Sequence, residues 1–175
     1  ISDVSKVIAL NPRDAMAYFS RGVAHAKLGN YRQAISDVDQ SIELNPRDAM
    51  AHFSRGVAYA RLGNYQAAIQ DFSRALELNP RHADSYYNRG VAYGKLGNYL
   101  QEIKDFNRAI GLAPDFAEAY YNRGVAYYKM NDYLQSINDC NKAIELNPQY
   151  AEAYYSRGIS YHKISNHEQG LQDCK

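Results

Sequence analysis

Five arginines recur along this chain at a constant interval of 34 residues, and an aspartate follows each of them sixteen residues later. The arginines are Arg21, Arg55, Arg89, Arg123 and Arg157, and the aspartates are Asp37, Asp71, Asp105, Asp139 and Asp173. Guanidinium and carboxylate groups form strong, often bidentate pairs. The two rows could pair with each other, or the arginines could hold an anion. Because the acids match the arginines one for one, the sequence favours pairing, and Asp3 extends the acidic row toward the start of the chain.

The spacing of the five prolines shows that the arginine and aspartate rows belong to a repeated unit. Pro12, Pro46, Pro80, Pro114 and Pro148 also lie 34 residues apart, so the chain is a tandem repeat. We place full repeats at 15–48, 49–82, 83–116 and 117–150, the end of a preceding repeat at 1–14 and a truncated fifth repeat at 151–175. Together they form one domain, and we expect it to be a piece of a longer protein.

Each repeat predicts two helices. In the first repeat, Gly29 ends the first helix, Asn30 is suited to cap the second, and that helix ends at Asn45 because proline disfavours helical geometry in the residue before it. The arginines lie on the packing side of the first helices and need partners there, so the predicted pairs bridge the two helices of a repeat or two neighbouring repeats. The later equivalents of Gly29 and Asn30 are Gly63, Gly97, Asn131 and Ser165, and Asn64, Asn98, Asp132 and Asn166.

The period and its recurring residues resemble the tetratricopeptide repeat family over essentially the whole chain. The family pattern is W-x2-L-G-x2-Y, then A-x3-F, then P. The third repeat shows Tyr86, Arg89, Gly90, Tyr93, Glu102, Phe106, Ala109 and Pro114. Tyr or His stands in place of Trp, and Arg in place of Leu. The resemblance implies an all-α fold, a right-handed α-α superhelix (solenoid) of stacked antiparallel helix pairs, whose concave face is built mainly from the first helices and binds peptide segments of partner proteins.

The candidate binding residues lie on the first helices, opposite the packing stripe. An aromatic row, a valine row and a basic row follow that face, with Ser and Asn side chains that offer hydroxyl or amide groups to a peptide backbone. Exposed aromatic residues repeated in register suggest a binding surface. The peptide-binding candidates are Phe19, Ser20, Val23, Phe53, Ser54, Val57, Arg61, Tyr87, Asn88, Val91, Lys95, Tyr121, Asn122, Val125, Tyr128, Lys129 and Tyr155, and Ser156 offers a further hydroxyl.

Two alternatives remain open for these rows. The aromatic residues could pack under neighbouring repeats as core, and the basic residues near the helix ends could simply favour the helix dipole. If the basic row touches a ligand, acidic side chains on the partner are favoured. The groove also changes along the chain, since Met16 and Met50 give way to Asp84, Glu118 and Glu152.

One specialised binding mode of the family is not expected. Members that capture the C-terminal carboxylate of chaperones resemble one another in using Lys and Asn at fixed groove points. This chain carries Phe19, Phe53, Tyr87, Val23, Val57 and Val91 at those points.

Composition excludes other classes of function. With 20 Lys and Arg against 19 Asp and Glu, the net charge is +1, which gives no electrostatic basis for binding nucleic acid. Recognition of one RNA base per repeat fits the period loosely, but the neutral charge opposes it. No apolar run of about 20 residues predicts a membrane span. Nucleotide-binding, zinc-protease and serine-hydrolase motifs do not occur, so we expect no enzymatic activity.

The cysteines and histidines predict no metal site or cofactor. Cys140 and Cys174 occupy equivalent places on helices separated by another helix. Packed helices lie about 8–10 Å apart, whereas a disulfide needs α-carbons within about 7 Å. We therefore expect free thiols, which favours a cytoplasmic location.

We expect a protein-interaction scaffold that holds an extended or helical peptide in its concave groove, without catalysis. The alternative is a self-assembling structural solenoid whose molecules associate end to end, because residues 1–10 and 164–175 expose apolar faces that neighbouring repeats normally cover.

Overall fold

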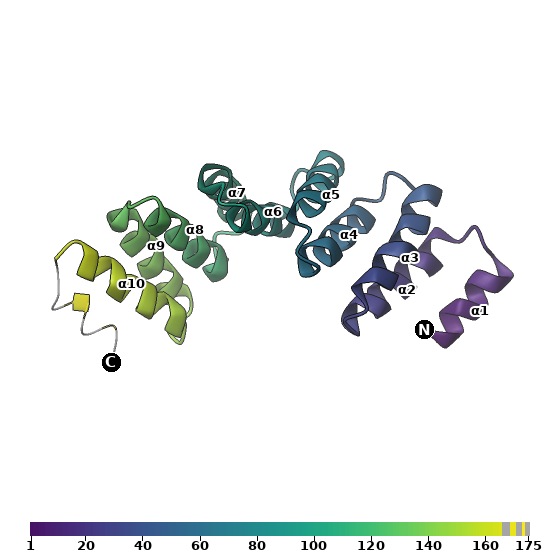
Figure 1. Cartoon of the computed structure of the whole chain (residues 1–175), viewed down its shortest axis with the longest axis horizontal. Coiled ribbons are helices and arrows are strands. Elements are labelled where there is room, and N and C mark those ends of the chain that lie inside the picture. Colours follow the sequence, from purple (N-terminus) through teal and green to yellow (C-terminus); the bar gives the residue numbers. More distant parts are fainter. Residues whose placement is uncertain (166–168, 171–172, 174–175) are drawn as a thin grey trace. The chain divides into compact units, whose positions relative to one another are not determined.

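The protein is helical throughout the part that the computed structural model describes, residues 1–165, 169, 170 and 173. Short turns connect the helices, which fall into two compact units, residues 1–92 and 93–175, with α6 running from the first into the second. The helices are α1 (Ser2–Leu10), α2 (Ala15–Lys27), α3 (Tyr31–Leu44), α4 (Ala49–Arg61), α5 (Tyr65–Leu78), α6 (Ala83–Lys95), α7 (Tyr99–Leu112), α8 (Ala117–Lys129), α9 (Tyr133–Leu146) and α10 (Ala151–Lys163) (Figure 1).

The first unit is built from antiparallel hairpins, α2 with α3 and α4 with α5. In addition, α3 packs against α4, and α1 packs against α2. Glycines allow the helices of a hairpin to approach closely. A Cβ atom added to Gly22 would lie 2.8 Å from Cγ2 of Val38, and one added to Gly56 would lie 2.8 Å from Cε1 of Phe72. Val38 and Phe72 are fully buried, so the glycines make room for the core of this unit.

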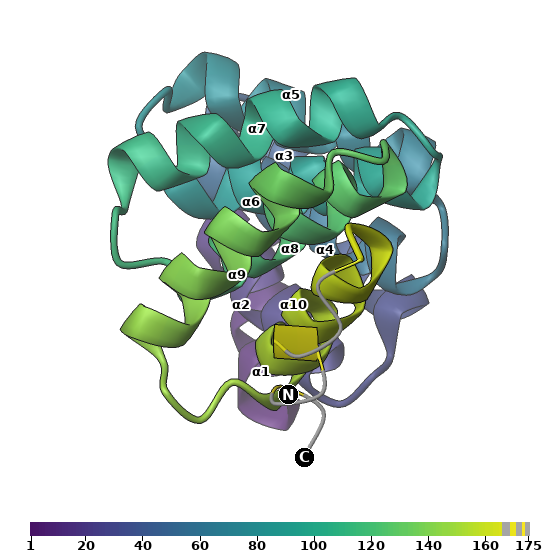
Figure 2. The same ribbon diagram turned by 90° about the vertical axis from the view of Figure 1, so that its left-hand side faces the viewer.

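The second unit follows the same design. Here α8 and α9 form a hairpin, α7 packs against α8, and α10 packs against α9 (Figure 2). Phe106, Ala109 and Ala143 belong to its core. Cys140 is a buried free thiol, as predicted, and burial raises its pKa to about 12, which makes it unreactive. Cys174 lies outside the described residues.

Left-handed residues end the first helices, as predicted. The φ angle is 78° at Gly29, 78° at Gly63 and 76° at Gly97, and it is 63° at Asn131 and at Ser165. The second helices begin at the predicted N-caps, and the side chains of Asn64, Asn98 and Asp132 accept a backbone N–H of the first turn. Asn30 holds the same place without such a bond, and Asn166 lies outside the described residues.

The predicted all-α fold of consecutive antiparallel helix pairs is confirmed. Below, α2, α4, α6, α8 and α10 are called the first helices, and α3, α5, α7 and α9 the second helices. Within the described part of the chain, no helix combines the length and the apolar character needed to cross a membrane.

Candidate peptide-binding site

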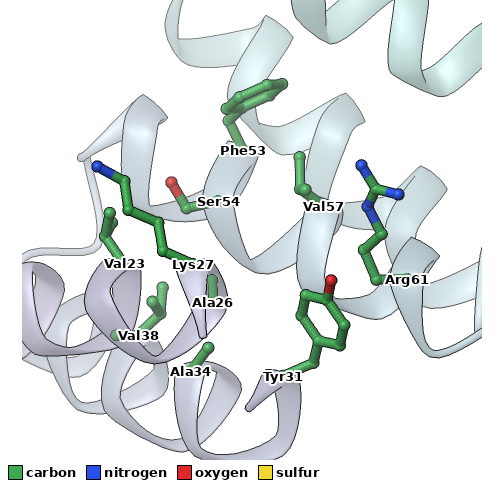
Figure 3. A pocket seen from close by; sticks show the side chains of 11 residues that line it. Val23, Ala26, Lys27, Tyr31, Ala34, Val38, Phe53, Ser54, Val57 and Arg61 are labelled. Carbon is green, nitrogen blue, oxygen red and sulfur yellow. The ribbon is translucent and has the colours of Figure 1, made fainter. Parts of the chain in front are cut away.

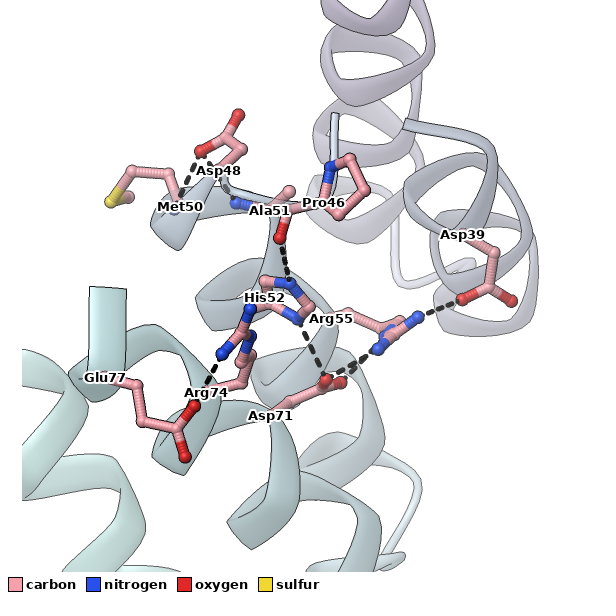
Figure 4. Close-up of polar contacts among 10 residues, drawn as sticks. All are labelled: Asp39, Pro46, Asp48, Met50, Ala51, His52, Arg55, Asp71, Arg74 and Glu77. Carbon is pink, nitrogen blue, oxygen red and sulfur yellow. Dashed lines mark hydrogen bonds and ion pairs between the residues drawn. The ribbon is translucent and has the colours of Figure 1, made fainter. Parts of the chain in front are cut away.

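The predicted Arg–Asp pairs join the two helices of a hairpin. Arg55 on α4 donates from Nε and Nη2 to the two carboxylate oxygens of Asp71 on α5, at 2.8 and 2.7 Å (Figure 4). These hydrogen bonds raise the pKa of Arg55 against the opposing effect of burial. Arg89 and Asp105 lie in different units, and their pairing stays a prediction. The same bidentate contact joins Arg21 to Asp37, Arg123 to Asp139 and Arg157 to Asp173.

Each arginine also reaches the second helix of the preceding repeat. Its remaining nitrogen, Nη1, donates to the residue sixteen places earlier, which is Ser5, Asp39, Ser73, Asn107 or Asn141. One guanidinium therefore makes both of the bridges that the sequence left open. Sequence reasoning missed this polar row, although its regular spacing is visible in the sequence. Where both contacts are described, as for Arg55, both ends of the guanidinium fork are used to join helices of the fold.

Asp3, at the equivalent repeat position near the start of the chain, lies on the surface. The side chain of Asp3 is 95% exposed and lies 3.4 Å from the ammonium of Lys6.

Aromatic rings support the arginines. The ring centroid of the tyrosine three residues earlier lies 5.3–5.7 Å from the guanidinium carbon in four repeats, which is a cation–π contact. In α4, His52 takes this place. Its Nδ1 lies 3.5 Å from Asp71 and its Nε2 lies 3.2 Å from the carbonyl of Pro46. The histidine therefore keeps the network connected where the tyrosine is absent. The four tyrosines are Tyr18, Tyr86, Tyr120 and Tyr154.

The candidate binding residues all keep some exposure. The exposed ones are Ser20, Arg61, Lys95, Lys129 and Tyr155. The half-buried ones are Phe19, Val23, Phe53, Ser54, Val57, Tyr87, Asn88, Val91, Tyr121, Asn122, Val125 and Tyr128. Ser156, in contrast, is 9% exposed and its hydroxyl is poorly placed to reach a ligand.

The described rings of the aromatic row pack against neighbouring rings and stay partly exposed. The ring of Phe53 lies 5.8 Å from that of Phe72 and 4.9 Å from that of His82. Two repeats later, the rings of Tyr121 and Tyr150 are likewise 4.9 Å apart. Phe53 and Tyr121 thus each pack against the residue just before the next first helix, His82 or Tyr150. Both rings remain partly exposed.

A pocket of about 280 Å³ opens in the first unit among α2, α3 and α4 (Figure 3). Five of the candidate residues line it: Val23, Phe53, Ser54, Val57 and Arg61. The rest of the lining is Gly22, Ala26, Lys27, Tyr31, Ala34 and Val38. The lining is mostly apolar, with the basic side chains of Lys27 and Arg61 on opposite sides. The pocket therefore offers an apolar interior beside positive charge.

One residue that lines this pocket is smaller than its equivalent in the next hairpin. Val38 lies opposite Gly22, and the equivalent residue of the next hairpin, Phe72, fills the corresponding place opposite Gly56. Valine is smaller than phenylalanine, and Val38 lines the pocket. Sequence reasoning missed the contribution of the second helix, namely Tyr31, Ala34 and Val38, because it considered only the exposed faces of the first helices.

Sequence models of the tetratricopeptide repeat match nearly the whole chain. One matches residues 2–35, 24–80 and 59–117, a second matches 117–150, and a third matches 140–172. The chain belongs to the tetratricopeptide repeat family. This membership supports a role in protein interaction. The unusual feature of its tetratricopeptide repeats is the arginine in place of the usual leucine, and the Arg–Asp pairs account for it.

Solved tetratricopeptide repeat structures share the fold. A crystal structure of MamA has a TM-score of 0.87 and 24% identity, covering 91% of this chain and 87% of that one. MamA 41-end from Desulfovibrio magneticus RS-1 has a TM-score of 0.87 and 24% identity, covering 91% and 90%. YrrB, described as "a TPR protein with an unusual peptide-binding site", has a TM-score of 0.84 and 24% identity, covering 97% and 88%. Among curated proteins, none matches the chain.

The asparagines of the tetratricopeptide groove face make local contacts. The amide of Asn88 donates to the carbonyl of Asp84 at 2.8 Å, and that of Asn122 donates to the carbonyl of Glu118 at 2.9 Å. Each bond runs back one turn along the same helix. An asparagine amide carries two N–H groups, and this bond engages one of them.

Proposed function

We propose that this chain is a non-catalytic protein-interaction scaffold that binds an extended or helical peptide segment of a partner protein on the groove face of its first helices. The observation that carries this proposal is the pocket among α2, α3 and α4, which five of the seventeen candidate residues line. A cavity of about 150 Å³ is enough to hold a benzene ring. A pocket of about 280 Å³ therefore has room for a leucine or phenylalanine side chain of the peptide.

Charge adds a second requirement to the peptide. Lys27 and Arg61 both line the pocket and are exposed. Opposite charges at an interface favour the correct partner and speed its association. The peptide that suits this pocket carries an apolar residue with Asp or Glu beside it.

The test uses peptides selected from a random display library on the wild-type protein. Their affinities are then measured by fluorescence anisotropy for the wild type and for Val38→Phe, which introduces the residue that Phe72 and Phe106 provide at the same repeat position. We expect the selected peptides to share an apolar residue next to an acid, and Val38→Phe to weaken their binding about tenfold or more.

A matched control is Cys140→Phe, which places the same residue at the equivalent position of α9, outside the pocket. We expect it to bind like the wild type, and thermal unfolding of both variants checks that they are folded. Equal affinity of the wild type and Val38→Phe for every selected peptide would contradict a binding role of this pocket.

End-to-end self-assembly is the second candidate function, and the surface of α1 favours it. Val7 and Leu10 are 43% and 87% exposed, and α1 has no buried residue. Sedimentation velocity over a range of concentrations tests this function. If it holds, the wild type forms larger species as concentration rises, and Val7→Glu with Leu10→Glu stays monomeric.

A further inference from the structure

Glu102 places a carboxylate where the first two repeats have a methyl group. The equivalent residues of α3 and α5 are Ala34 and Ala68, which are 2% and 0% exposed. Glu102 on α7 is itself only 9% exposed. A buried charge is costly unless it is paired, so this substitution in the third repeat calls for an explanation.

The carboxylate of Glu102 occupies the space of a missing side chain on α6. A Cβ atom added to Gly94 would lie 2.5 Å from Cδ of Glu102 and 2.6 Å from Oε2. The equivalents of Gly94 in the two preceding repeats are Ala26 and Ala60. The glycine and the glutamate therefore occur together, and the glycine makes room for the acid.

This location corresponds to the pocket of the first unit. Ala26 and Ala34, which Gly94 and Glu102 replace, both line that pocket. Within the second unit, the Glu102 carboxylate therefore takes the repeat position that lines the pocket in the first unit.

The Glu102 carboxylate lacks a hydrogen-bond partner among the described residues. Among the described residues, none donates a hydrogen bond to Glu102 or forms an ion pair with it. Burial raises the pKa of Glu102 to about 7, and the positive charge of Lys95 on α6 opposes this rise. By repeat equivalence with the pocket of the first unit, the other titratable groups at this level are Tyr99 on α7 and Tyr121 and Lys129 on α8.

We propose that Glu102 is a subsite of the second unit that receives a lysine or arginine side chain of the bound peptide. A cationic side chain supplies the charge-assisted hydrogen bonds that the carboxylate lacks. The exposed side chains of Lys95 and Lys129 are long and can turn toward solvent to admit it. This inference rests on the proposed peptide-binding function and adds a second recognition element to it.

The test selects peptides from one random display library on two proteins, the wild type and Glu102→Ala. The variant carries the residue of Ala34 and Ala68, so it is expected to fold, and circular dichroism checks this. We expect the wild-type pool to be enriched in Lys and Arg and the variant pool to lose this enrichment. The apolar and acidic preference of the first unit stays in both pools.

Affinity measurements on individual peptides sharpen the result. Replacing the selected Lys or Arg of a peptide by Gln is expected to weaken wild-type binding about tenfold and to leave Glu102→Gln binding unchanged. Wild-type binding of the cationic peptide is expected to strengthen from about pH 6 to about pH 8, as Glu102 ionises, whereas Glu102→Gln binding stays flat.

The outcomes separate this inference from the proposed function. Pools with equal Lys and Arg content on the two proteins, or affinity that falls as pH rises, overturn the Glu102 subsite and leave peptide binding intact. A library that yields no binder for either protein overturns the proposed function and the subsite with it.

Discussion

Arg55 and Asp71 hold each other through two parallel hydrogen bonds, Nε to Oδ2 at 2.8 Å and Nη2 to Oδ1 at 2.7 Å. Asp71 is buried, with a side chain 7% exposed, while that of Arg55 is 21% exposed. This contact recurs in three other repeats of the described chain and explains why a charged residue stands on the packing face of these first helices.

Removing only the acid of this pair should destabilise the protein strongly. Asp71→Ala leaves the Arg55 guanidinium without its main partner and also takes a contact from His52. Breaking a buried pair from one side typically costs about 3–5 kcal/mol. We expect a loss of this size in the free energy of unfolding by urea.

Replacing both partners should cost much less. The double variant Arg55→Met with Asp71→Leu removes the two charges together, and apolar replacements of buried pairs are often close to neutral. If the double variant unfolds at the same urea concentration as Asp71→Ala, the asymmetry proposed for this pair is wrong.

The contact of Arg55 with Asp39 of the preceding repeat should contribute less stability than its contact with Asp71 in the same repeat. Asp39 accepts from Nη1 of Arg55 at 2.7 Å, but its side chain is 41% exposed. Asp39→Asn introduces the residue type that Asn107 and Asn141 supply to their arginines. We expect a loss below about 1 kcal/mol, which salt reduces further.

Urea unfolding of Asp39→Asn at low and high salt measures this loss of stability and its dependence on salt. The reference is the wild type under the same two conditions. A loss as large as that of Asp71→Ala would show that the bridge to the preceding repeat, and not the pair within the hairpin, dominates.

Two equivalent glycines should respond differently to alanine. A Cβ at Gly56 would lie 2.8 Å from the ring of Phe72, whereas a Cβ at Gly124 would lie 3.2 Å from Cβ of Asp139 and 3.4 Å from Sγ of Cys140. Overpacking a core costs about 1–3 kcal/mol, and alanine recovers about 1 kcal/mol of helix propensity.

Gly56→Ala should therefore lose about 1–2 kcal/mol, while Gly124→Ala should stay near the wild type. Thermal unfolding of the two variants side by side gives the comparison. The steric explanation fails if Gly124→Ala is the more destabilised of the two.

Glu102 should make the stability of the protein depend on pH. Its pKa is raised in the folded protein to about 7 from the ordinary value of 4.5. Folding therefore favours the protonated form, and the penalty is absent below about pH 4.5, grows between the two pKa values and is complete above about pH 7. A shift of this size corresponds to a penalty on the order of 3 kcal/mol.

We expect Glu102→Ala to be more stable than the wild type at about pH 8 and nearly equal to it at about pH 4. Urea unfolding at the two pH values checks this. A constant difference between the proteins across this range would mean that the carboxylate does not titrate in the predicted window.

The sequence predicted the hairpins well because their signals are local and repeated. Gly29, Asn30 and Pro46 mark the ends of helices through backbone geometry alone, and a 34-residue period repeats each signal. The Arg–Asp pairs were also predictable, since one fixed offset links the two rows. The contacts of Arg55 with Asp39 were missed because that row varies among Ser, Asp and Asn.

The candidate site was less predictable, because a pocket depends on differences in volume. Val38 and Phe72 are both apolar residues on a core face, and the hydrophobic pattern treats them alike. Both approach a glycine equally closely, at 2.8 Å, and only the structure shows that Val38 also lines a pocket. The position of the Glu102 carboxylate likewise depends on a glycine eight residues earlier, on another helix.

The contacts of Arg55 with two different helices also affect how the protein responds to mechanical load. Arg55 contacts Asp71 on α5 and Asp39 on α3. Pulling the α4–α5 hairpin away from α3 therefore breaks a contact of the same guanidinium that joins α4 to α5. Under tension, adjoining hairpins of a unit should consequently rupture in concert, in larger extension steps than a string of independent hairpins would give.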